Sequence, residues 1–330
     1  MSRSRLFALL LVIALAAPAL FGRGDEDTGE LRRARLLMGT VVEITLLDGG
    51  AENNAEAALE AAFNAMAEVE ACMSAHRDDS ETARLNVAAG PLEVSAATAE
   101  VLELGLRVAA ASGGAFDLTL GRLKALWGFD GDGPRVPDDA EIAAALRGIG
   151  PEALRLEGRR VTKGDAVLGI DLGAIAKGYA VDRAVAALQA AGIRRASVNA
   201  GGDLRLLGNH GGRPWRIGIQ HPRDPQGVLV TLELADAAVV TSGDYERFFE
   251  VDGVRYHHIL DPRDGRPADA CQSVTVVAAS AAEADALATA AFVLGPEAGR
   301  LLVESWGGMA LIVAADGTVS LSEALKDRVR

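Results

Sequence analysis

The chain has 330 residues, 49% of them hydrophobic, which is enough apolar material for one large domain or two ordinary domains. Its formal net charge is -13. Because a protein needs a basic surface to bind phosphate backbones, this charge argues against nucleic acid as a partner. A small anionic ligand would need positive charge supplied locally.

The N-terminus has the layout of a secretory signal peptide. Arg3 and Arg5 precede an apolar run over residues 6–21 that ends near small residues suited to cleavage. The run is at the short end for spanning a bilayer, which favours removal over a retained anchor. No cysteine closely follows it to accept a lipid. We expect a signal peptide at 1–24, a domain at 30–330, and export to the periplasm or the outer face of the cytoplasmic membrane.

The sequence holds two cysteines, Cys72 and Cys271. In an oxidising compartment they could form one disulfide, but a domain of this size does not need a covalent cross-link. We expect two free thiols that are buried or half-buried.

The first half of the chain alternates strand patterns with amphipathic helices. The expected elements are a strand over 36–47 opened by Gly39 and turned at 48–50, a helix over 55–73, a short helix capped by Ser80, helices over 98–111 and 138–147, and a hairpin over 154–168. The acidic stretch 130–134 lacks the twelve-residue loop of a calcium site, so we interpret it as a surface turn.

The second half contains more strands. The expected elements are a strand over 166–171, a helix over 179–191 stopped by Gly192, a strand over 196–203 ending in two glycines, strands over 215–222 and 229–234, a hairpin of 248–251 with 254–259, a strand over 273–279, and a helix over 281–294.

The stretch 171–182 places polar residues where a strand pattern gives way to a helix. Exposed loop amides, a positive helix end and Lys177 suit an anion, particularly a phosphate. The alternative is an ordinary turn with a solvated lysine. The loop has neither the Walker A pattern nor the dinucleotide-binding glycine pattern, so a phosphate site here would be of another kind.

A carboxylate and a hydroxyl share one face of the apolar helix over 281–294. Asp285 and Thr289 are four residues apart, and that face should be buried. A buried, unpaired carboxylate is costly, and a hard cation with oxygen ligands, such as Mg²⁺, would offset the cost. The alternative is an aspartate that caps a helix or pairs locally.

His257 and His258 lie together at the end of a strand, where alternation sends them to opposite faces. Further zinc ligands at suitable spacing are absent, which favours an acid–base or hydrogen-bonding role. A Ser-His-Asp hydrolase could be drawn from Ser242, His258 and Asp244 or Asp261, but the Gly-x-Ser-x-Gly motif is missing.

Seven ordered motifs together resemble the ApbE family of FAD:protein FMN transferases. They are Met38-Gly39-Thr40, Ala115-Phe116-Asp117, residues 171–182, residues 199–203, residues 241–247, His258-Ile259 with Asp261-Pro262, and Asp285 with Thr289. The resemblance covers nearly all of the chain after the signal segment. It implies an α+β fold, a single two-lobed domain of mixed and antiparallel sheets with flanking helices. It also implies that the FMN half of FAD is transferred to a threonine, or sometimes serine, of an exported redox protein, with release of AMP.

The resemblance also implies roles for individual residues. Mg²⁺ would be held by Asp285, Thr289 and the backbone carbonyl of Ala174, while His258 would take the acceptor proton. Asp244 is a second catalytic candidate. FAD would be bound by Lys177, Asp171, Met38, Ala115, Phe116, Asp117 and Ile259. His76 stands where members usually place a tyrosine, and the lipid-attachment cysteine of many members is absent.

Two other functions remain open at this point. The same residues could hydrolyse FAD to FMN and AMP with water as the acceptor, or the chain could be an exported flavin-binding protein without catalytic activity. The acceptor is expected to be a membrane-associated redox subunit. The metal role of Ala174 carries a geometric requirement: the regular helix must begin after Ala174, because a helical bond to Gly178 would occupy its carbonyl.

Overall fold

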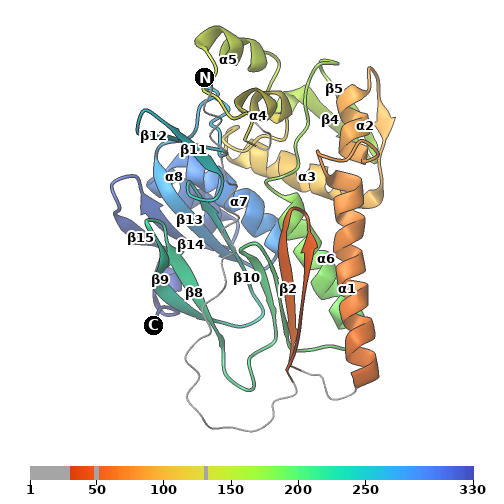
Figure 1. The fold of residues 1–330 in the computed structure, drawn as a ribbon, viewed down its shortest axis with the longest axis vertical. Coiled ribbons are helices and arrows are strands. Elements are labelled where there is room, and N and C mark those ends of the chain that lie inside the picture. The colour runs from red at the N-terminus through yellow and green to blue at the C-terminus, as the bar shows by residue number, and fades with distance from the viewer. Residues whose placement is uncertain (1–29, 48–51, 130–132) are drawn as a thin grey trace, which may run out of the picture.

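The computed structural model describes residues 30–47, 52–129 and 133–330 (Figure 1). The expected signal peptide at 1–24, the turn at 48–50 and most of the expected turn at 130–134 lie outside the described residues.

An eight-stranded sheet forms the centre of the structure, and its paired strands are all antiparallel. The strands lie in the order β1 (Leu31–Leu37), β2 (Thr40–Leu46), β6 (Ala196–Ala200), β7 (Asp203–Leu207), β10 (Ala238–Gly243), β13 (Cys271–Ala278), β14 (Met309–Ala314) and β15 (Val319–Leu321).

The two faces of the sheet are covered differently (Figure 1). One face packs against the helices α1 (Glu52–Met73), α3 (Ala96–Ala111), α6 (Ala176–Ala190), α7 (Ala281–Leu294) and α8 (Pro296–Ser305). The other face packs against the hairpin of β8 (Trp215–His221) with β9 (Asp224–Leu234) and against α9 (Glu323–Lys326).

The alternation of side chains along the strands explains why two cores form. On β10, Ala238 and Val240 belong to the helix-side core, whereas Val239 belongs to the core under the β8–β9 hairpin. Neighbouring side chains of a strand point to opposite faces, so a strand that is apolar throughout is buried on both.

Two groups of smaller elements complete the structure. The helices α4 (Gly121–Trp127) and α5 (Asp139–Ala145) and the hairpin of β11 (Phe248–Val251) with β12 (Val254–His257) build a third core around Trp127. The other group is α2 (Glu81–Val87), a 3-10 turn (Pro151–Ala153), and the sheet of β3 (Leu92–Glu93), β5 (Arg160–Lys163) and β4 (Leu154–Glu157), and it adds Leu85, Leu154 and Val161 to the helix-side core. The indole of Trp127 donates to Gly265 O at 2.9 Å and stacks on Phe129.

The predicted α+β class is confirmed, and the long helices agree with their predicted ranges to within a few residues. Ser80 caps α2 as expected, accepting from Ala83 N at 2.9 Å. The hairpin turn at Asp252-Gly253 is also present, and both residues have positive φ. Cys72 and Cys271 are free thiols, half-buried and buried respectively.

One strand prediction was wrong, and one strand was missed. The segment 166–171 is not a strand, because its only ladder contact among the described residues is a single parallel bridge from Gly169 to Leu120. The strand expected after Gly39 is present as β2, but it is the second strand of a hairpin with β1, in which Met38 (φ 52°) and Gly39 (φ 71°) form the turn. The sequence did not predict β1 because the three arginines of this segment interrupt the apolar alternation that is typical of a strand.

No helix in the described part of the chain is long and apolar enough to cross a membrane.

Candidate functional site

The start of α6 and the loop before it form one side of the candidate site. The regular helix begins at Ala176, so the geometric requirement on Ala174 is met. Gly178 N, which would otherwise bond to Ala174 O, donates instead to Asp285 Oδ2 at 3.1 Å. The Ala174 carbonyl therefore lies outside the regular hydrogen bonds of α6 and can serve as an oxygen ligand.

The N-termini of α6 and α7 pack closely enough to make this contact. A Cβ at position 178 would lie 2.2 Å from Ala281 O, so only glycine fits there. Asp182, one turn further along α6, accepts from Ala281 N at 3.0 Å and Ala282 N at 2.9 Å. These bonds cap α7 from outside and fix the orientation of the helix that carries Asp285 and Thr289.

Asp285 is buried, with 4% of its surface exposed. Burial and the neighbouring Asp203 carboxyl raise the pKa of Asp285 to about 7. Thr289, half-buried one turn along α7, places its Oγ1 3.3 Å from Ser242 Oγ of β10. Asp285 and Thr289 therefore lie on one face of α7, as predicted, and this face is directed towards β10 and α6.

Asp203 is a site residue, like Lys124, to which the sequence patterns assigned no role. It starts β7 directly after the glycine pair, is 2% exposed, and its Oδ2 accepts from Lys177 Nζ at 2.5 Å. Its carboxyl is also close enough to Asp285 to raise the pKa of that group. Burial alone would lower the pKa of Lys177, but the Asp203 and Asp285 carboxylates raise it. The available signal was a polar residue at a strand end beside flexible backbone.

This donor set fits a hard divalent cation. Two buried carboxylates with one ammonium leave a negative charge to be offset by a proton or a cation. Among the described residues no group of three or more His, Cys, Asp or Glu side chains could hold a metal ion. A cation here would depend also on Ala174 O, the Thr289 hydroxyl, water and ligand oxygens, a mixture that suits Mg²⁺.

Asp171 lies beside a second lysine. Its Oδ1 accepts from Lys124 Nζ of α4 at 2.5 Å and from Gly173 N at 2.9 Å. Burial would raise the pKa of Asp171, but Lys124 and the Gly173 amide lower it, so the group stays ionised. Asn86 holds the preceding residue, Ile170, through hydrogen bonds to both its N and its O.

Asp117 presents a buried oxygen without a partner. Its Oδ1 accepts from Thr119 N at 2.7 Å and Thr119 Oγ1 at 2.6 Å, whereas Oδ2 has no hydrogen-bond partner among the described residues. Burial raises the pKa of Asp117. A ligand that donates a hydrogen bond would satisfy Oδ2. Ala115 and Phe116 are buried beside it.

The two histidines have different environments. His257 is buried; its Nε2 bonds to Ala268 O at 2.8 Å and its Nδ1 accepts from Ile259 N at 3.3 Å, so both ring nitrogens are occupied. His258 is half-buried, and its Nδ1 lies 3.3 Å from Arg247 O. A carbonyl can only accept, so Nδ1 carries the proton and Nε2 keeps its lone pair.

The electrostatic surroundings keep His258 neutral. Burial, followed by the charges of Arg247 and Lys124, lowers the pKa of His258 to about 3. Asp244, expected as a second catalytic group, is bound at both oxygens by Arg223, at 2.7 Å each. Asp244 therefore forms a structural ion pair with Arg223. The orientation of His258 is set instead by its hydrogen bond to Arg247 O.

The remaining candidates, Met38, Ile259 and His76, come from three separate parts of the chain. Met38 forms the β1–β2 turn and is half-buried against the helix-side core, and Ile259 is buried just after β12. His76 is exposed after α1, with its backbone amide bound to Ser74 Oγ. No hydrogen bond in the described part of the chain joins these three residues to Asp203 or Asp285, which together form the acid pair.

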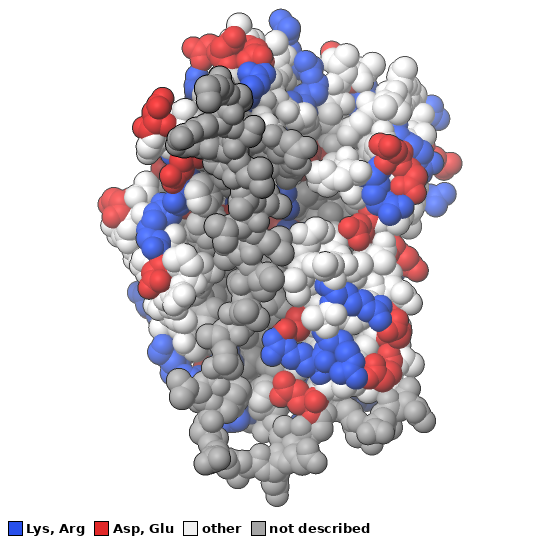
Figure 2. Space-filling model, in the orientation of Figure 1, with Lys and Arg blue, Asp and Glu red and all other residues white. Residues whose placement is uncertain are grey.

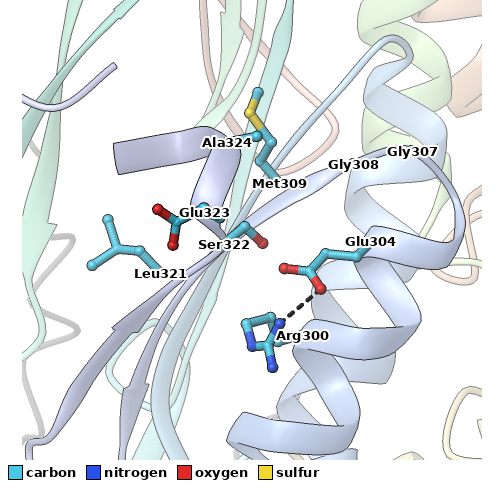
Figure 3. A pocket seen from close by; sticks show the side chains of 9 residues that line it. All are labelled: Arg300, Glu304, Gly307, Gly308, Met309, Leu321, Ser322, Glu323 and Ala324. Carbon is cyan, nitrogen blue, oxygen red and sulfur yellow. Dashed lines mark hydrogen bonds and ion pairs between the residues drawn. The ribbon is translucent and has the colours of Figure 1, made fainter. Parts of the chain in front are cut away.

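An open hollow lies elsewhere, between α8, β14 and the C-terminal residues (Figure 3). Arg300 and Glu304 form an ion pair of 2.7 Å on its wall, and Ser322 lies across from them. None of the candidate site residues lines it, so it is separate from the site. On the face drawn in Figure 2, acidic and basic side chains lie near one another.

Comparison with known proteins decides the family. Residues 38–313 match the model of the ApbE family. The chain belongs to this family. A FAD:protein FMN transferase of Treponema pallidum (strain Nichols) is 38% identical over 331 residues, covering 93% of this chain and 91% of the relative. One from Vibrio cholerae is 37% identical, covering 89% and 90%.

Solved ApbE structures share the fold. The ApbE protein of Thermotoga maritima has a TM-score of 0.83 at 38% identity, covering 91% of this chain and 99% of that one. The flavin transferase ApbE of Vibrio cholerae has a TM-score of 0.82 at 35% identity with the same coverage. The acid pair, the two lysines and His258 therefore lie on an ApbE fold.

Proposed function

We propose that this protein transfers FMN from FAD to a threonine or serine hydroxyl of an acceptor protein and releases AMP. The relatives that carry this activity in their names support the class of reaction. The observation that carries the proposal is the buried pair of Asp285 and Asp203, which leaves negative charge for a cation next to Lys177, whose ammonium suits a pyrophosphate.

The reaction needs one bond made, one broken and one proton moved. The acceptor oxygen bonds to the phosphorus of the FMN half, the bond from that phosphorus to the bridging oxygen breaks, and AMP leaves with the bridging oxygen. His258 Nε2 takes the hydroxyl proton; the hydrogen bond from Nδ1 to Arg247 O orients the ring for this.

The cationic side chains bind the phosphates. Lys177 and Lys124 are both half-buried, and the ammonium group of each lies beside a carboxylate near the loop 171–175. Mg²⁺, held by Asp285, Thr289 and Ala174 O, would offset charge that develops on the pyrophosphate. Asp171 orients Lys124 and the Gly173 amide.

The nucleotide would be held by residues around Asp117. Its Oδ2, which has no partner in the described part of the chain, would accept a hydrogen bond from a hydroxyl or amino group of FAD. Apolar contact would come from Ala115, Phe116, Met38 and Ile259. His76 is exposed and would contact FAD by stacking its imidazole where other members place a tyrosine.

Two alternatives use the same residues. Water in place of the acceptor hydroxyl gives FAD hydrolysis to FMN and AMP, and binding without turnover makes the chain a flavin carrier. The position of Asp244 in its ion pair with Arg223 offers no support for a Ser-His-Asp hydrolase. We also propose export by the signal peptide and a membrane-associated redox subunit as acceptor.

Incubation of the protein with FAD and Mg²⁺, with and without an acceptor domain, separates these functions. Flavin fluorescence that stays with the acceptor after denaturation means transfer, AMP without an acceptor means hydrolysis, and neither product means binding alone. Asp285→Ala should abolish turnover, and His258→Ala should lose transfer while keeping FAD bound. His210→Ala, on a histidine that packs against Trp215, is the matched control. Full activity of Asp285→Ala would contradict the metal assignment.

A further inference from the structure

Three titratable side chains from three separate segments of the chain lie together in the site. Asp203 comes from β7, Lys177 from the first turn of α6 and Asp285 from α7. Lys177 Nζ lies 2.5 Å from Asp203 Oδ2, and the Asp203 carboxyl lies close enough to Asp285 to raise its pKa. The Lys177 ammonium therefore interacts with two buried carboxyl groups.

We propose that Lys177 is an exchangeable counterion: it neutralises Asp203 until a divalent cation binds between Asp203 and Asp285, and it then turns to the FAD pyrophosphate. Asp203 thereby becomes a further carboxylate of the cation centre. The identity of the phosphate ligand rests on the proposed function, whereas the exchange itself rests on the cluster.

The two partners differ in how freely they can move. Asp203 is 2% exposed and begins β7, where it pairs with Ala200 of β6, so its backbone is held in the central sheet. The Lys177 side chain keeps 26% of its surface exposed on a flexible four-carbon stem. A competitor for the carboxylate oxygens would displace the lysine and leave the aspartate in place.

The exchange predicts opposite effects of removing the two partners. Asp203→Asn should weaken Mg²⁺ or Mn²⁺ binding by about 10–100-fold, the usual cost of losing a group that supports a metal site. Lys177→Gln should strengthen it by about tenfold or more, because the competing positive charge is gone. Both affinities are measured by isothermal titration calorimetry on the intact protein without FAD or acceptor.

Lys124→Gln is the matched control, since Lys124 is also a half-buried lysine paired at 2.5 Å, but with Asp171. It should change cation affinity much less than Lys177→Gln does. Equal or weaker cation binding by Lys177→Gln, or an equal gain in Lys124→Gln, would overturn the exchange.

Circular dichroism checks that each variant is folded. Asp203→Ser is measured beside Asp203→Asn because the site is buried, and Lys177→Gln alone decides the exchange if both Asp203 variants unfold. Failure of the proposed function would look different: the unaltered protein would bind cation and FAD yet give neither AMP nor a flavinylated acceptor.

Discussion

Gly178 N donates to Asp285 Oδ2 at 3.1 Å, joining residues 107 positions apart in the chain. The bond fixes the orientation of the carboxylate and diverts the amide that would otherwise occupy Ala174 O. One glycine thus prepares two of the three expected cation ligands.

Gly178→Ala should therefore damage the cation site as well as the fold. The added methyl would meet Ala281 O and force α6 and α7 apart, at a cost of about 1–3 kcal/mol in the free energy of unfolding. Thermal denaturation and Mg²⁺ titration check both effects. Gly90→Ala is the control, because no atom lies within 4 Å of the position that its methyl group would take, and it should leave both quantities unchanged.

Asp182→Ala should loosen α7 at its N-terminus. The loss of hydrogen bonds to Ala281 N, Ala282 N and Ser280 Oγ removes an external cap, which is worth about 1–2 kcal/mol. We expect weaker Mg²⁺ binding in addition to the lower melting temperature. Asp138→Ala removes the cap of α5, which carries no candidate site residue, so it should lower stability alone. An unchanged Mg²⁺ affinity in Asp182→Ala would refute a positioning role.

His258 should remain a neutral base well below its ordinary pKa of 6.5, because its pKa in the fold is about 3. At saturating Mg²⁺, kcat/KM for the acceptor should show no inflection near pH 6.5. An inflection there that disappears in His258→Gln would contradict this expectation.

The lowered pKa of His258 also reduces the free energy of unfolding in acid. Its folded pKa lies below its unfolded pKa, so the unfolded chain binds the extra proton between pH 6.5 and about 3. The contribution is absent above pH 6.5, and stability falls as pH falls through that window. Comparing unfolding free energies of the unaltered protein and His258→Gln across this range measures it.

Asp117→Ala should weaken FAD binding by about 1.5–3 kcal/mol, the usual worth of a hydrogen bond to a charged group. Its Oδ2 is buried and has no partner within the described chain, so a ligand donor is expected there. Quenching of flavin fluorescence reports the affinity without an acceptor. Thr119→Val removes a neighbouring hydroxyl and leaves Oδ2 in place, so it should retain FAD binding.

Sequence patterns predicted the elements with strong periodicity. The apolar helix over 281–294 has the predicted limits, and the helix start after Ala174 followed from the requirement that its carbonyl stay available. The helix limits depended on local spacing, which the sequence records directly, whereas the requirement on Ala174 came from the resemblance to the ApbE family.

The contacts between distant segments were beyond such patterns. Nothing near Asp203 indicates that Lys177 and Asp285 lie against it, because the pairing arises only when β7, α6 and α7 pack together. The apolar residues of segment 166–170 predict a strand, yet the segment is held by Asn86 and by Lys163, whose Nζ donates to Ala166 O and Leu168 O. Side-chain anchoring of an extended segment leaves no periodic signal.

The order of strands in the central sheet has a consequence for folding. From β6 onward the neighbours are close in sequence, whereas the pairing of β2 with β6 closes a loop of about 150 residues that contains most of the helices, at a large cost in chain entropy. The C-terminal strands can therefore associate early, and β1 and β2 should join last. Since α6 lies within that loop and α7 follows β13, the cation centre is assembled from an early and a late part of the folding chain.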